Sequence, residues 1–153
     1  MNNQDGQAGG SRPKKILVVD DNLVVLKALS LKLTSKDFQV FTADDGAAAV
    51  SAARREKPDL ILLDISFPPE PGFVWDGFSI MEWLRRTEES KNTPIIIITG
   101  GDPAKYKDHS LAIGAAAFFH KPIDHEELLV AIRKVLDRDG GARPPATGAG
   151  SQV

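Results

Sequence analysis

The chain has 153 residues, of which 42% are hydrophobic and 26% charged, and its formal net charge is -2. These values are typical of one soluble globular domain, and they argue against a surface that binds nucleic acid or an anionic membrane. The absence of cysteine excludes disulfides, thiolate chemistry and cysteine zinc sites. No apolar run approaches the ~20 residues of a membrane span, and the N-terminus lacks a signal-peptide core, so we expect a cytoplasmic protein.

Short apolar runs alternate with helical patterns between two polar tails. The N-terminal tail, 1–13, is rich in Gly and polar residues, and the C-terminal tail, 139–153, is rich in Gly and Pro. We expect both tails to be disordered. The domain between them, 14–138, has predicted strands at 16–19, 38–43, 59–64, 95–99 and 116–119. Helical patterns follow each strand, at 23–36, 46–56, 78–88, 103–114 and from 125 onward, with Asp124 as the cap of the last. Such alternation predicts a parallel sheet with right-handed crossovers and helices on both faces.

Four of the five predicted strands end in polar side chains. Asp20 and Asp21 follow the first strand, Asp64 ends the third, Thr99 ends the fourth and Lys121 follows the fifth. The β–α loops of a parallel sheet all open on one edge, which is where such folds bind ligands. We therefore expect these five residues to lie together.

The residue types at this edge suit phosphoryl transfer. Three crowded carboxylates repel one another, and a divalent cation such as Mg²⁺ relieves the repulsion. Because carboxylates can act as nucleophiles, we predict that Asp64 accepts a phosphoryl group, with Lys121 and Thr99 contacting its oxygens. Taken singly, each residue also has a structural explanation: Asp20 can help to cap a helix, and Lys121 can be a solvated charge.

These segments resemble the receiver domain of two-component response regulators, over about residues 14–138. The resemblance is carried by the segments 16–21, 59–64, 94–100 and 120–122. It implies a flavodoxin-like, doubly wound (βα)5 fold with a five-stranded parallel sheet of order 2-1-3-4-5.

The resemblance also implies roles for particular residues. Asp64 would take its phosphoryl group from a histidine kinase or a histidine phosphotransfer protein. Asp21 and Asp64 would ligate Mg²⁺ directly, Asp20 would help through water, and the Ser66 backbone carbonyl would complete the site.

A switch is implied as well. Thr99 and Phe118 look like the pair of residues that respond to phosphorylation in relatives, changing the face made by helix four, strand five and helix five. Lys121-Pro122 resembles the family's cis peptide, which would aim the lysine.

We expect a stand-alone, single-domain regulator that is a monomer or a weak homodimer. It would signal to an unknown protein target without contacting nucleic acid or membrane, and its only catalysis would be its own phosphorylation and slow dephosphorylation. A receiver-like interaction module that needs no phosphorylation is the main alternative. A phosphohydrolase is disfavoured because Ser66 stands where such enzymes need a second Asp, and a flavin module because Asp20-Asp21 would repel a phosphate.

One segment departs from the family pattern. After Pro68, the expected Asp-Gly pair arrives about five residues late, as Asp76-Gly77, so that Pro68–Gly77 contains an insertion. This longer loop would alter phosphate lifetime or partner choice, or simply pack against helix three, since loop length is cheap in free energy.

Overall fold

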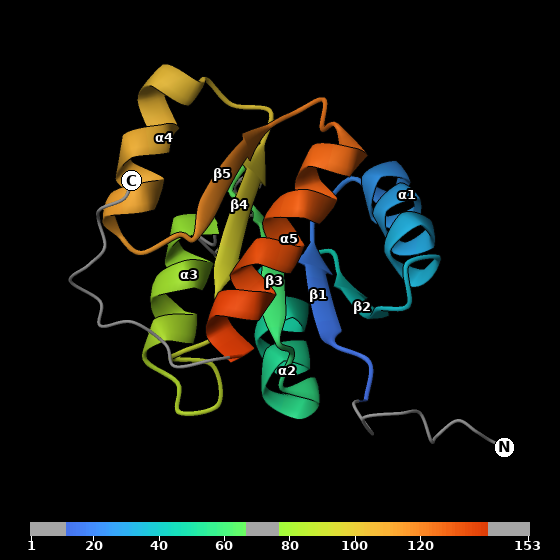
Figure 1. Cartoon of the computed structure of the whole chain (residues 1–153). Helices are drawn as coiled ribbons and strands as arrows, with labels where there is room; N and C mark the ends of the chain where they lie inside the picture. The colour runs from blue at the N-terminus through green and yellow to red at the C-terminus, as the bar shows by residue number, and fades with distance from the viewer. Residues whose placement is uncertain (1–11, 67–76, 141–153) are drawn as a thin grey trace, which may run out of the picture.

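One parallel sheet forms the centre of the molecule. The computed structural model describes residues 12–66 and 77–140. Its strands lie in the order β2-β1-β3-β4-β5, as predicted, and their arrowheads all point to the same edge (Figure 1). The strands are β1 (Lys15–Val19), β2 (Gln39–Ala43), β3 (Leu60–Asp64), β4 (Ile95–Thr99) and β5 (Ala117–His120).

A helix follows each strand and returns the chain to the other edge. The helices are α1 (Leu23–Thr34), α2 (Gly46–Glu56), α3 (Gly77–Arg85), α4 (Pro103–Ala112) and α5 (His125–Gly140). The element boundaries differ from the predicted ones by up to three residues, and α5 continues two residues past the predicted end of the domain at 138. The tails beyond these limits and most of the Pro68–Gly77 insertion lie outside the described residues.

Apolar residues fill both faces of the sheet. On one face, α1 and α5 pack over a cluster that includes Val18, Leu62 and Ile96. On the other face, α2 and α3 pack over Leu63 and Ile97. Every residue of β3 and β4 is buried, as the uninterrupted apolar runs predict for strands covered on both sides.

Side-chain oxygens set several helix ends. Asn22 caps α1 by accepting the backbone amides of Val24 and Val25. Asp124 accepts the amides of Glu126 and Glu127 at the start of α5, at 2.9 and 3.1 Å, which confirms its predicted capping role.

The predicted end of helix three was too late, because side chains beyond Arg85 bond back to the helix. The Thr87 hydroxyl donates to the Trp83 carbonyl at 3.0 Å, and the Ser90 hydroxyl donates to the Leu84 carbonyl at 2.9 Å. These bonds satisfy carbonyls at the end of the helix and turn the chain toward β4.

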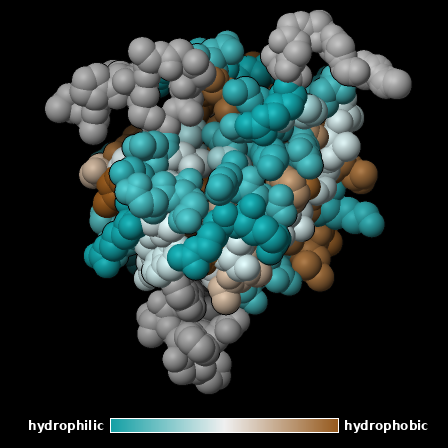
Figure 2. Space-filling view, turned by 90° about the horizontal axis from the view of Figure 1, so that it is seen from below, coloured by the Kyte–Doolittle hydropathy of each residue, from teal (hydrophilic) through white to brown (hydrophobic). Residues whose placement is uncertain are grey.

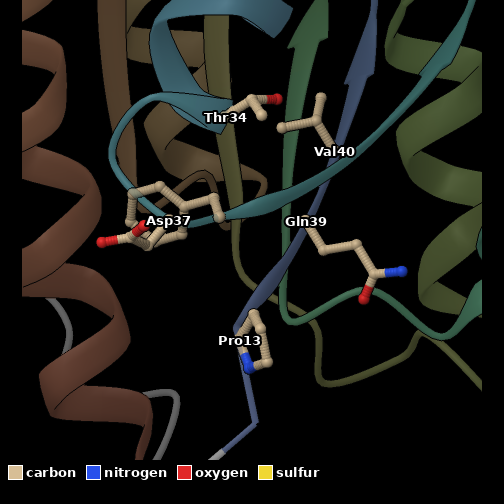
Figure 3. A pocket seen from close by; sticks show the side chains of 6 residues that line it. Pro13, Thr34, Asp37, Gln39 and Val40 are labelled. Carbon is tan, nitrogen blue, oxygen red and sulfur yellow. The ribbon is translucent and has the colours of Figure 1, made fainter. Parts of the chain in front are cut away.

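The edge of the sheet where the strands begin is mostly polar. Seen from this end, hydrophilic residues cover most of the surface (Figure 2). A pocket here is lined by residues before β1 and around the α1–β2 connection, among them Pro13, Thr34 and Gln39 (Figure 3). In the described part of the chain, no helix is both long enough and apolar enough to cross a bilayer.

Candidate functional site

Strand register brings the predicted site residues to one edge. Val19 of β1 pairs with Leu63 of β3. Asp20 and Asp64 are the residues that follow this pair, so they lie side by side. Thr99 pairs with His120, which places Lys121 just beyond the end of β5. The expectation that the polar strand ends meet at the C-terminal edge is thereby met.

A single ammonium bridges two buried carboxylates. Asp20 is 0% exposed and Asp64 is 2% exposed. The Lys121 ammonium donates to Asp20 Oδ2 at 2.7 Å and to Asp64 Oδ2 at 3.0 Å. Each carboxylate also accepts a backbone amide with its other oxygen, Asp20 from Asn22 at 2.9 Å and Asp64 from Ser66 at 2.8 Å. Lys121 therefore lies where the sequence predicts a cation, beside the proposed phosphoacceptor.

Burial and the neighbouring charges shift the pKa of Asp20 and the pKa of Lys121. Burial raises the pKa of Asp20, and the neighbouring charge of Asp64 adds to the rise, although bonds from Lys121 and Asn22 oppose it. Burial alone would lower the pKa of the Lys121 ammonium, but its bonds to Asp20 and Asp64 and their charges outweigh burial and raise that pKa. The lysine thus stays charged, whereas Asp20 loses its proton less readily than a solvent-exposed aspartate does.

Asp21 adds a third carboxylate on the solvent side of the pair. Ligand oxygens of Asp20, Asp21 and Asp64 all lie within 4.8 Å of one another. Asp21 is exposed, and within the described residues its carboxylate makes no hydrogen bond or ion pair. It is therefore free to bind a ligand from solvent.

The residues at this edge fit Mg²⁺. One carboxylate oxygen of each of Asp20, Asp21 and Asp64 lies within 4.8 Å of the other two, so the three side chains converge on one place where a cation could bind. Three carboxylates and one ammonium leave a formal charge of -2, which a divalent cation would neutralise. Hard oxygen donors are also the type that Mg²⁺ prefers.

Thr99 is buried beside Asp64 and has two partners. Its hydroxyl accepts the Gly101 amide at 3.1 Å and forms a hydrogen bond with the Ser66 hydroxyl. Only the backbone carbonyl of Ser66 was predicted to lie at the site, and the contact made by its side chain was missed. The sequence did contain a signal for this contact. Ser66 stands two positions after Asp64, and a hydroxyl there can reach the end of the neighbouring strand.

Phe118 lies on the same face of the sheet as Thr99. It pairs with Ile97 in β4, two residues before Thr99, and side chains two apart in a strand share a face. Its ring is partly buried against the cluster beneath α2 and α3. The Lys121-Pro122 peptide bond is cis, as the resemblance implied.

The fold and this acidic edge define a doubly wound α/β domain with a centre of the receiver type. The family model described as "Response regulator receiver domain" matches residues 16–133, most of the chain. The chain therefore belongs to the family of response regulator receiver domains. Members of this family are signalling domains that bind Mg²⁺ and are phosphorylated by histidine kinases or phosphotransfer proteins.

Relatives with this domain differ in length. The chain is 35% identical over 122 residues to protein PilH of Pseudomonas aeruginosa, covering 80% of this chain and 97% of PilH. It is 31% identical over 140 residues to the probable transcriptional regulatory protein TcrX of Mycobacterium tuberculosis, covering 92% of this chain but 55% of TcrX. It is 36% identical over 121 residues to the response regulator PleD of Caulobacter vibrioides, covering 79% of this chain but only 26% of PleD.

Solved structures show the same fold. The chemotaxis protein CheY4 of Vibrio cholerae superposes with a TM-score of 0.72 at 30% identity, covering 80% of this chain and 98% of that one. The BeF3-activated N-terminal receiver domain of RstA from Klebsiella pneumoniae superposes with a TM-score of 0.71 at 31% identity, with the same coverage. The predicted order 2-1-3-4-5 and the predicted family are thereby confirmed.

Proposed function

We propose that this chain is a phosphoacceptor receiver in which Asp64 takes a phosphoryl group from a phosphohistidine donor with Mg²⁺ bound. The observation that supports this proposal most is the Lys121 ammonium held between Asp20 and Asp64, with the Asp21 carboxylate open to solvent beside them. A purely structural ion pair would gain nothing from a third carboxylate placed nearby without a partner.

The transfer is a displacement at phosphorus. The Asp64 carboxylate attacks, an oxygen–phosphorus bond forms, and the phosphorus–nitrogen bond of the donor breaks so that the imidazole leaves. The Lys121 ammonium lies within hydrogen-bond distance of Asp64 Oδ2. After the transfer it would donate a hydrogen bond to a phosphoryl oxygen, which then carries the negative charge. Asp20, Asp21, Asp64 and the Ser66 carbonyl would hold Mg²⁺, which neutralises charge on the transferring group when it is bound.

The output of this centre would be a change in protein–protein contacts. Thr99 and Phe118 would relay the modification to the face formed by α4, β5 and α5, and thence to a protein target or the next carrier of a phosphorelay. We expect the protein to act in the cytoplasm as a monomer or weak homodimer, without direct contact to nucleic acid or membrane. Its catalysis is limited to its own phosphorylation and slow dephosphorylation.

Incubation with acetyl phosphate and Mg²⁺, followed by intact-mass measurement, tests the proposal. We expect the wild type to gain one phosphoryl group, and we expect both chelation of Mg²⁺ and the variant Asp64→Asn to abolish the gain. Asp59→Asn, at the opposite edge of the sheet, is the matched control and should be modified like the wild type.

Two results would contradict the proposal. If Asp64→Asn gained the group as fast as the wild type, Asp64 would not be the acceptor. If the wild type gained none from acetyl phosphate or from histidine kinases, the phosphorylation-independent interaction module would be the better account.

A further inference from the structure

Ser66 contacts both the proposed phosphoacceptor and the proposed switch residue. Its backbone amide donates to Asp64 Oδ1 at 2.8 Å, and its hydroxyl forms a hydrogen bond with the Thr99 hydroxyl. Ser66 lies two residues beyond the end of β3, whereas Thr99 is the last residue of β4. One serine therefore links the ends of two neighbouring strands at the site.

The surroundings of Thr99 determine the direction of that hydrogen bond. A threonine hydroxyl has one proton to donate, and the Gly101 amide, at 3.1 Å, can only donate to it. Thr99 is 0% exposed, so water cannot take its proton, and within the described residues Ser66 is its other partner. Because buried hydroxyl groups are almost always satisfied, we assign the Thr99 proton to Ser66 Oγ. Ser66 is exposed and can direct its own proton to water.

Of the two contacts, the bond to Ser66 is the one that can be exchanged. Gly101 lies close to the Tyr106 ring of α4, since a Cβ on Gly101 would lie only 2.7 Å from that ring. Its amide can only donate to Thr99, so it does not compete for the Thr99 proton. A phosphoryl oxygen on Asp64 could replace Ser66 as acceptor, because the Thr99 proton has no other acceptor among the described residues.

We propose that Ser66 is a positioning residue whose hydroxyl holds the Thr99 proton in the unphosphorylated protein and yields it to a phosphoryl oxygen when Asp64 is modified. This inference rests on the proposed function. Because the Ser66–Thr99 bond exists only before the exchange, it stabilises the unphosphorylated form. Removing the Ser66 hydroxyl therefore favours binding of a phosphoryl group or its analogue.

Beryllofluoride with Mg²⁺, a non-covalent substitute for the phosphoryl group, makes the exchange measurable at equilibrium. We expect Ser66→Ala, which keeps the backbone carbonyl and amide, to bind beryllofluoride about 2- to 10-fold more tightly than the wild type, the range that one hydrogen bond provides. In a Thr99→Val background, Ser66→Ala should leave the affinity unchanged. Ser66→Thr restores the hydroxyl and should bind like the wild type.

Urea unfolding without Mg²⁺ or beryllofluoride gives a second readout. Ser66→Ala should raise the unfolding equilibrium constant about 2- to 10-fold in the wild-type background, and much less in the Thr99→Val background. A role of Ser66 that does not involve Thr99 would give the same change in both backgrounds, and that result would overturn the inference.

The outcomes separate this inference from the proposed function. If the wild type binds beryllofluoride and Ser66→Ala binds it equally well, the inference alone is wrong. If the wild type neither binds beryllofluoride nor accepts a phosphoryl group, the proposed function fails, and the inference fails with it.

Discussion

The two edges of the sheet satisfy their charged side chains in different ways. Where the strands begin, Asp59 accepts the Lys15 backbone amide at 2.7 Å, and the Lys15 ammonium donates to the Glu56 carbonyl at 3.0 Å. Both side chains are bonded to the backbone of neighbouring elements, so they hold the first strand in place.

At the edge where the strands end, the charges depend on one another. Asp20 and Asp64 are buried and share the single ammonium of Lys121, while Asp21 has no partner within the described residues. Burial of paired carboxylates costs free energy that their ion pairs only partly offset. The comparison teaches that charges bonded only to backbone indicate structure, whereas two buried carboxylates that share one ammonium beside an unpartnered third carboxylate indicate a ligand.

The largest effect should follow from removing the shared cation. Lys121→Met leaves two buried carboxylates unpaired, and we expect it to lower the free energy of unfolding by about 3 kcal/mol in urea at neutral pH without Mg²⁺. Lys121→Arg keeps the charge and serves as the control. A loss no greater for Met than for Arg would mean that the ion pairs contribute little.

A smaller effect is expected at the opposite edge. Asp59→Ala leaves the partly buried Lys15 amide without its acceptor, and we expect a loss of about 1 kcal/mol in the same urea assay. Phosphorylation from acetyl phosphate should be unchanged, because Asp59 lies at the far end of the strands. If Asp59→Ala slowed phosphorylation at equal folded fraction, the two edges would not be independent.

The smallest effect, and one that depends on pH, should come from Asp20→Asn. Because the folded protein raises the pKa of Asp20, it binds this proton more tightly than the unfolded chain does. The contribution of Asp20 to stability is therefore full below its ordinary pKa of 3.8 and is lost as the pH rises through the raised value.

At neutral pH without Mg²⁺, we accordingly expect Asp20→Asn to be more stable than the wild type. The difference should shrink as the pH falls toward 3.8, as measured by urea unfolding across that window. A wild type that is the more stable of the two at neutral pH would show that the bond to Lys121 outweighs the cost of burial.

The fold and the meeting of the polar strand ends at one edge were predictable because backbone rules determine both. Uninterrupted apolar runs such as 95–99 predict strands buried on two faces, and parallel strands bring their following residues to one edge. Asp20, Asp64, Thr99 and Lys121 are therefore neighbours whatever their rotamers.

Contacts that depend on side-chain direction were not predictable. The hydrogen bond between Ser66 and Thr99 and the packing of Tyr106 on Gly101 depend on rotamers and on the path of the chain between elements. The end of α3 was misplaced for a related reason, because Thr87 and Ser90 bond back to the helix, and residue patterns do not distinguish such bonds from a further helical turn.

The central claim is that the buried carboxylate at the end of β3 is the one that carries the phosphoryl group. Borohydride reduction of the protein after treatment with acetyl phosphate and Mg²⁺ converts an aspartyl phosphate to homoserine, which peptide mass spectrometry then locates. We predict homoserine at position 64 only. Homoserine at Asp20 or Asp21 instead, or no homoserine in a protein that has gained a phosphoryl group, would contradict the account.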